Sequence, residues 1–322
     1  MELSLQSRCE KFTENRNILK ESFRWDSQEM YLLVSTLYTL AGKTADAEKL
    51  RDCEKLIKEE TGTFSGYRGH IRHPLAARMA MSADPKAYLD GVKILCDMLS
   101  GNRSGASVYK IISAMVLMDH TGCMTAEDEV EDTLDIFGRM KKEHPLLTKD
   151  EDMPFAALLA ASKADIDCIG LETEECYEIL RHRISNNNAV QSLSHVLALS
   201  GNDCEEKCDK LMKLSEELRI RNKDYGRDHE LAVLGALTIT ELSAEEAAER
   251  IKNADDYIKS ATENISEEHR MMYAAMLVLE DEEIKHNMAA SEKYGDFLCR
   301  IILLEMAIII MMLSLIETFK ED

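Results

Sequence analysis

The sequence is poor in helix-breaking residues and in aromatic side chains. Its 322 residues include 4 Pro, 14 Gly and a single Trp, and aromatic residues make up 6%. With so few breakers, and with abundant Ala, Leu, Met, Glu and Lys, the composition is typical of a predominantly helical protein. The scarcity of aromatic rings counts against the stacking platforms on which single-stranded nucleic acids bind.

Positive charge is also in short supply. The chain has 39 Lys and Arg against 60 Asp and Glu, which gives a formal net charge of −21. Such a surface repels a phosphate backbone and an anionic membrane alike. We therefore predict that nucleic acid is not a partner, and we do not expect the protein to bind membranes.

Targeting and disulfide signals are missing as well. Charges are scattered through the first twenty residues and leave no apolar signal segment, so a cytoplasmic protein is expected. The nine cysteines are odd in number and have no framework spacing, which favours reduced thiols over disulfides.

What the chain does contain is a repeat. A short segment rich in Leu, Ala and Met, called here an A segment, alternates with a longer charged amphipathic B segment. A segments occupy residues 31–43, 74–84, 108–120, 154–165, 190–203, 229–243 and 271–283. Their mean spacing of roughly 40 residues lies in the range of helical-hairpin repeats. A segments should form an inner layer and B segments an outer one.

Helix-terminal residues agree with this division. Pro74 and Pro154 suit the first turns of A helices, where a missing N–H costs nothing. N-cap residues are expected before or within the first turn of the B helices. They are Asp84, Thr125, Thr173, Asp203 and Ser243.

The fold class that follows is all-α. No Ser-, Gly- or Pro-rich linker divides the chain, so residues 1–322 are predicted to form a single helical-repeat domain. The repeats of roughly 40 residues would build an α-solenoid-like array or a ring-closed αα array.

The apolar segment at residues 298–319 could be a membrane anchor or a core helix. Its centre, Ile301 to Ile316, has 16 residues and contains Glu305. At 1.5 Å per residue it spans about 24 Å, short of the roughly 30 Å of a bilayer core. We predict a last inner helix, packed in the core or at a subunit interface. An N-terminal helix at about residues 3–22 has no A partner, so the two ends either meet or are covered by a second copy, as in a homodimer.

Four stretches resemble a known family: FRWDSQEMYLLVSTLYTLAGK, LIKEETGTFSGYRG, HPLAARMAMSADP and EHPLLTKDEDMPFAALLA. They are similar to an uncharacterised bacterial family, domain-of-unknown-function family 4003. The resemblance implies an all-helical protein and carries no assigned activity, so no residue role follows from it.

The most distinctive loop is TGTFSGYRGHIRHP, residues 61–74. Arg68, His70, Arg72 and His73 are its basic side chains, the densest group of positive charge in the chain. The loop precedes the start of an A helix, where exposed N–H groups and the helix dipole favour an anion. The opposing interpretation is a glycine-rich turn between repeats whose cations pair with nearby Glu residues.

Other side chains that could bind a ligand or metal are spread along the repeats. His73, His229 and His269 each fall at the start of an A helix and could lie along one rim. Stacked repeats advance by roughly 10 Å, too far for shared metal coordination. Cys204 and Cys208 lie at i and i+4, but no second pair completes a zinc site. We predict no metal and no cofactor.

The sequence has no recognised motif for nucleophilic or metal-dependent catalysis, and no catalytic residues are assigned. The first hypothesis is a non-catalytic helical-repeat binding or scaffold protein that binds a protein or peptide partner on the surface formed by its A helices. The alternative is an α/α-toroid enzyme, or a small-molecule or anion-binding protein, with a pocket near Arg68, His70 and His73. Arg72, His229 and His269 complete its set of ligand-binding residues.

Overall fold

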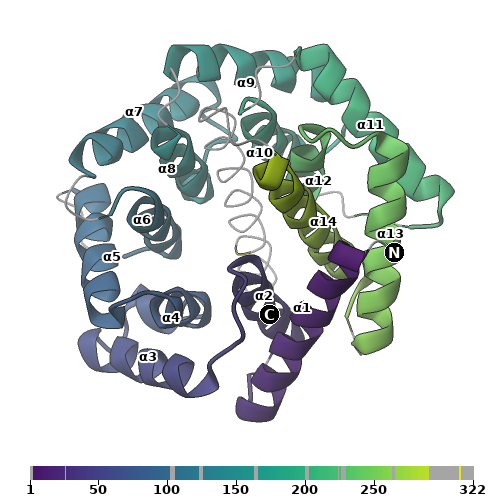
Figure 1. Ribbon diagram of the computed structural model, residues 1–322. Helices are drawn as coiled ribbons and strands as arrows, with labels where there is room; N and C mark the ends of the chain where they lie inside the picture. Colours follow the sequence, from purple (N-terminus) through teal and green to yellow (C-terminus); the bar gives the residue numbers. More distant parts are fainter. Residues whose placement is uncertain are drawn as a thin grey trace. The chain divides into compact units, whose positions relative to one another are not determined.

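The computed structural model describes residues 3–25, 27–101, 106–122, 126–162, 166–199, 203–223, 225, 230–262, 265–289 and 312. These residues form fourteen α-helices and two short 3-10 helices, and they contain no strand (Figure 1). The all-α prediction is confirmed.

Each A segment coincides with a helix. These helices are α2 (Gln28–Leu40), α4 (Arg72–Met81), α6 (Val108–His120), α8 (Met153–Ala161), α10 (Asn187–Leu197), α12 (Glu230–Thr238) and α14 (Glu267–Ala289). The B helices are α3 (Ala47–Glu60), α5 (Pro85–Ser100), α7 (Glu127–Glu143), α9 (Ile166–Leu180), α11 (Cys204–Ile220) and α13 (Ala244–Ala261). The helix α1 (Leu3–Ser22) precedes them, and the 3-10 helices are η1 (Gly66–Arg68) and η3 (Asp150–Asp152).

Burial follows the difference in composition between the two classes. All nine residues of α8 and all nine of α12 are buried, because their sequences are apolar on every side. The outer helix α13 instead buries one stripe, Ala247, Ile251, Ala254 and Ile258, which lie three or four residues apart. Each fully buried Ile or Leu contributes about 1.5–3 kcal/mol relative to an exposed one. The A helices are therefore core elements.

Of the five predicted N-caps, three are confirmed, and Thr125 lies outside the described residues. Asp84 and Asp203 accept backbone N–H groups of α5 and α11, and Ser243 forms a capping box with Glu246. The prediction for Thr173 is wrong, because this residue lies inside α9. The helix begins seven residues earlier, at Ile166, since no Pro interrupts the helical pattern between these positions.

The chain divides into two compact units. One consists of Met1–Asn17, Arg24–Gly42 and Asp167–Asp322, and the other of Ile18–Phe23 and Lys43–Ile166. In the second unit α3 packs on α4, α5 on α6, and both α6 and α7 on α8. Each outer helix there covers an inner helix next to it in sequence, as Figure 1 shows.

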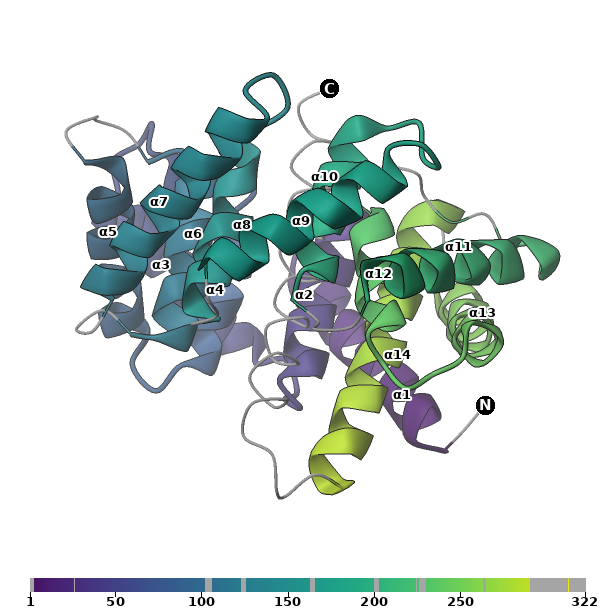
Figure 2. The same ribbon diagram turned by 90° about the horizontal axis from the view of Figure 1, so that it is seen from above.

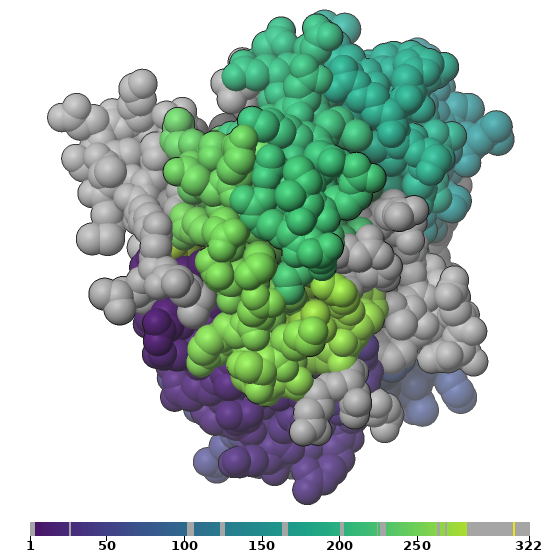
Figure 3. Space-filling view, turned by 90° about the vertical axis from the view of Figure 1, so that its right-hand side faces the viewer, coloured from purple at the N-terminus to yellow at the C-terminus, as the bar shows by residue number. Residues whose placement is uncertain are grey.

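In the first unit, segments from both ends of the sequence pack together. α10 contacts α12, α12 contacts α14, and α14 contacts α2. The rings of Phe12 on α1 and Tyr273 on α14 have centroids 6.5 Å apart. Arg16 donates to the carbonyl of Ala261 at the end of α13. Figures 2 and 3 show α1 beside α14 and adjoining α13.

α14 differs from its prediction. The A segment was expected to end near residue 283, with a separate charged helix following it, but one continuous helix runs to Ala289. No Gly or Pro occurs within it to break the hydrogen-bond ladder. The predicted core helix at 298–319 lies outside the described residues, apart from Met312, which is helical and buried. Among the helices that are described, none is long and apolar enough to cross a membrane.

Candidate functional site

Arg68, in the basic loop, is directed at the end of a helix. Its guanidinium donates to the carbonyl of Thr61 at 2.7 Å and also to that of Lys58. These carbonyls belong to the C-terminal end of α3, where a cation complements both the unpaired oxygens and the helix dipole. Arg72 similarly donates to the carbonyl of Arg68 at 3.1 Å. Both arginines therefore bind carbonyl groups of their own chain.

His73 is buried at the start of α4 and pairs with a carboxylate. Its Nδ1 contacts Glu54 of α3, which is also buried. Its Nε2 lies 3.4 Å from an Arg72 nitrogen. His70, by contrast, is exposed at the turn that leads into α4. The loop thus matches the turn-and-pairing interpretation for His73, while anion binding at Arg68, His70 and Arg72 stays a prediction.

A close backbone approach holds this loop in place. A Cβ added to Gly66 would lie 2.2 Å from the carbonyl oxygen of Ala106. Only glycine fits at that distance, so the loop and the segment before α6 pack without an intervening side chain.

The remaining predicted residues are divided between the units. His269 belongs to the first unit, whereas residues 68–73 belong to the second. The Nδ1 of His269 lies 3.8 Å from the carboxylate of Glu29 on α2, and this neighbouring imidazole lowers the pKa of Glu29 to about 2. His229 lies outside the described residues. No group of three or more metal-ligating side chains suited to an ion occurs in the described part of the chain.

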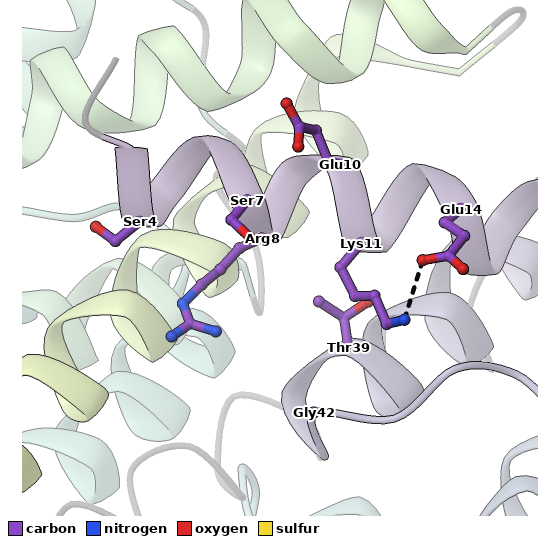
Figure 4. A pocket seen from close by; sticks show the side chains of 8 residues that line it. All are labelled: Ser4, Ser7, Arg8, Glu10, Lys11, Glu14, Thr39 and Gly42. Atoms are coloured by element: carbon purple, nitrogen blue, oxygen red, sulfur yellow. Dashed lines mark hydrogen bonds and ion pairs between the residues drawn. The ribbon is translucent and has the colours of Figure 1, made fainter.

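A pocket of about 630 Å³ opens along α1 (Figure 4). Six of its lining residues come from α1 and two from the end of α2. They are Ser4, Ser7, Arg8, Glu10, Lys11, Glu14, Thr39 and Gly42. The side chains of Arg8 and Lys11 project to the side on which Thr39 and Gly42 lie, whereas Glu10 projects the other way. The pocket thus has polar walls with charges of both signs.

Local contacts fix the α2 wall of the pocket. The Asn15 side chain on α1 donates to the hydroxyl of Thr39 at 3.1 Å, both residues being buried. Gly42 ends α2 with a φ of +64°, a conformation that glycine adopts without strain. On α1, Lys11 and Glu14 form an ion pair at 3.0 Å. The pocket is therefore supported by buried contacts from one helix to the other.

Behind the pocket lies a cluster of buried charges. Glu280 and Asp281 on α14 are 2% and 0% exposed. Arg8 Nε lies 2.6 Å from a Glu280 oxygen and 3.4 Å from an Asp281 oxygen. Ser4 donates to Asp281 at 3.2 Å, and Arg250 of α13 pairs with the same carboxylate. The cluster ties α1 and α13 to α14.

Glu280 is the group in this cluster whose acidity is most altered. Burial raises the pKa of Glu280 to about 8, although the neighbouring Arg8 acts in the opposite direction. Glu280 is therefore largely protonated in neutral solution. Neither the pocket nor this cluster was predicted, because charges spaced along α1 resemble an ordinary solvated helix face.

Comparison with known proteins places the chain in a family. A protein of Bacillus subtilis (strain 168) described as uncharacterized protein YeaA is 23% identical over 219 residues. That alignment covers 64% of this chain and 66% of the Bacillus protein, just under two thirds of its length. No solved structure matches the chain. Residues 15–312 match the family described as protein of unknown function (DUF4003), and the chain belongs to that family.

Proposed function

We propose that this protein is a non-catalytic helical-repeat protein that binds a protein or peptide partner, and that the α1 pocket is its contact site. The observation that carries the proposal is the pocket itself, which opens along α1. The A helices offer little surface, since α8 and α12 are buried along their whole length. A partner surface on A helices is therefore less well supported than one on α1.

The repeat architecture is part of this proposal. Packing between successive A helices, from α10 to α12 to α14, supports helical-hairpin repeats stacked in sequence order. The contact of α2 with α14 supports an array whose first helices meet its later ones, in preference to an array with two open ends.

The dimensions of the pocket suit a short peptide. Its α1 residues run from Ser4 to Glu14, a distance of about 15 Å at the rise of an α-helix. An extended peptide of four or five residues covers the same length at about 3.3 Å per residue. The lining carries charges of both signs, Arg8 and Lys11 against Glu10 and Glu14, which favours a segment that itself carries both charges.

The chemistry of the lining supports binding over catalysis. The lining residues include neither His nor Cys, so Ser4 and Ser7 have no neighbouring imidazole to act as a base. Arg8 contacts Glu280 and Asp281 behind the pocket, and Lys11 pairs with Glu14.

Site-specific photo-crosslinking in the native host tests the proposal. A photoreactive amino acid replaces Ser7, which is exposed at the pocket, and in a control replaces Glu131, which is exposed on α7. We expect one discrete crosslinked species from position 7 that is absent from position 131. Equal crosslinking from both positions, together with turnover of a small molecule by the purified protein, would refute the proposal.

The alternative, an anion pocket near Arg68, His70 and His73, is less well supported. Arg68 and Arg72 already bind backbone carbonyls, and His73 pairs with Glu54. Titration with inorganic phosphate tests it directly. A saturable change in the NMR signals of His70, lost in Arg68→Gln, would favour this site over the α1 pocket.

A further inference from the structure

Three cysteine thiols converge between α9 and α11. Cys204 and Cys208 lie one helical turn apart on α11, and Cys176 of α9 lies close enough to both for their thiols to influence its pKa. The contact between the helices is reinforced nearby, because the Cys204 thiol lies 3.8 Å from the carbonyl oxygen of Glu172. The sequence pattern showed only the α11 pair, and the third thiol comes from 28 residues earlier. All three are free thiols and buried.

Cations surround the cluster on the α11 side. Lys207, next to Cys208, is buried, pairs with Glu172 and donates to the carbonyl of Leu197 at 2.8 Å. Arg183 forms an ion pair with Asp209 at 2.5 Å. Positive charge next to a thiol favours its thiolate, which is the nucleophilic form.

The three thiols differ in acidity. The pKa of Cys208 is lowered, chiefly because it accepts the hydrogen bond of the Cys176 thiol, with Arg183 and Lys207 acting in the same direction. The same hydrogen bond, together with burial, raises the pKa of Cys176. Burial raises the pKa of Cys204 to about 12. Cys208 therefore loses its proton first, and Cys176 is the thiol already in contact with it.

We propose that Cys176 and Cys208 are a redox-active dithiol that a hydroperoxide converts into an intramolecular disulfide joining α9 to α11. The Cys208 thiolate attacks one oxygen of hydrogen peroxide, the O–O bond breaks, and Cys208 sulfenic acid and hydroxide form. The Cys176 sulfur then attacks the sulfenic sulfur, and an S–S bond replaces the S–O bond. The Cys176 proton neutralises the hydroxide that leaves. In total two thiols are oxidised and one peroxide is reduced to two water molecules.

Helix geometry excludes the pair on α11, and acidity distinguishes the two pairs that remain. Cys204 and Cys208 are at i and i+4 of one helix, where Cβ atoms are about 5–6 Å apart. A disulfide requires a Cβ separation of about 3.5–4.5 Å, so this pair cannot close without distorting α11. Cys204 can reach Cys176, but its raised pKa leaves it the weaker nucleophile. Burial limits the oxidant to a molecule about the size of water, whereas Cys168, exposed on α9, remains open to larger reagents.

Peptide mapping of the full-length protein tests the proposal. The protein is treated with hydrogen peroxide, unfolded in the presence of an alkylating reagent that blocks the remaining free thiols, and digested with trypsin. Cleavage after Lys207 puts Cys204 and Cys208 on separate peptides. A Cys168→Ser background removes the other thiol from the peptide that carries Cys176. We expect a cross-linked peptide containing Cys176 and Cys208, lighter by two hydrogens and separable with a reductant.

Matched variants sharpen the result. Cys176→Ser should abolish the cross-link, whereas Cys53→Ser, at a buried cysteine on α3, should retain it. If Cys176→Ser does not fold, the map of the parent protein decides alone. A Cys176–Cys204 cross-link would overturn the proposal. So would the absence of any cross-link when parallel wild-type protein shows complete oxidation of Cys168.

Discussion

Arg8 and Glu280, 272 positions apart in the sequence, are in direct contact: Arg8 Nε lies 2.6 Å from an oxygen of the buried Glu280 side chain. This pair fixes the N-terminal helix against α14 and so positions the wall of the α1 pocket. Arg8 also reaches Asp281, which is fully buried. The pocket therefore depends on charges that are not part of its lining.

Replacement of Arg8 should destabilise the protein. Arg8→Ala leaves two buried acidic groups with one guanidinium fewer, and breaking such a pair costs roughly 3 kcal/mol. The free energy of unfolding from urea denaturation measures this loss. Lys11→Ala is the control, because the Lys11–Glu14 pair is largely exposed and should contribute less than about 1 kcal/mol. Equal effects of the two substitutions would contradict the role given to Arg8.

Glu280 predicts a loss of stability towards alkaline pH. Its pKa is about 8 in the folded protein against 4.5 ordinarily, so between these values the folded state holds a proton that the unfolded state has released. The free energy of unfolding must then fall as pH rises through this window, by at most about 5 kcal/mol. In Glu280→Gln the side chain no longer titrates, so this contribution to the pH dependence of stability is removed. The stability difference between wild type and variant should change between pH 5 and pH 8, and a constant difference would refute the assignment.

Glu29 predicts the opposite trend in acid. The neighbouring His269 imidazole holds its folded-state pKa at about 2, below the ordinary 4.5. Its stabilisation is complete above pH 4.5 and is lost as the pH falls towards 2. Because Glu29 is partly exposed, solvent screening limits the effect to about 1 kcal/mol. In thermal melts, Glu29→Gln should lower the melting temperature at pH 6 more than at pH 3.

Gly66 and Gly62 form a matched pair for testing the basic loop. Gly66→Ala places a methyl group against the Ala106 carbonyl and should cost about 1–3 kcal/mol through displaced backbone. At Gly62 an added Cβ meets nothing within 4 Å, so Gly62→Ala should stay within about 0.5 kcal/mol. Urea denaturation compares the two. Similar losses at both positions would show that the close approach at Gly66 does not hold the loop.

Local sequence predicted the helices well. Apolar spacing placed α6 at its observed bounds of Val108–His120, and capping residues such as Asp203 gave the start of α11. The N-cap prediction for Thr173 was wrong because a residue type that favours N-caps does not begin a helix when the residues before it also favour helix. The continuity of α14 was missed because a change from apolar to charged residues does not by itself end a helix.

The sites were much less predictable, since they depend on contacts between distant segments. Arg68 and His73 were identified as a basic cluster, but a sequence does not reveal that Arg68 would bind carbonyls of α3. The α1 pocket requires α1 to meet α2 and α14, and no local pattern encodes that meeting. Cys176 likewise has no sequence signal connecting it with Cys208.

The pairing of α1 and α2 with α14 also has a consequence for synthesis on the ribosome. Their packing partner α14 is translated more than 200 residues after these helices. At about 5–20 residues per second, α1 and α2 wait for roughly 10–50 seconds with apolar side chains such as Phe12 and Leu32 unprotected. Helices α3 to α8 have their partners close in sequence and can pack during this interval. We therefore expect the nascent chain to need chaperones to protect α1 and α2 until α14 has left the ribosome.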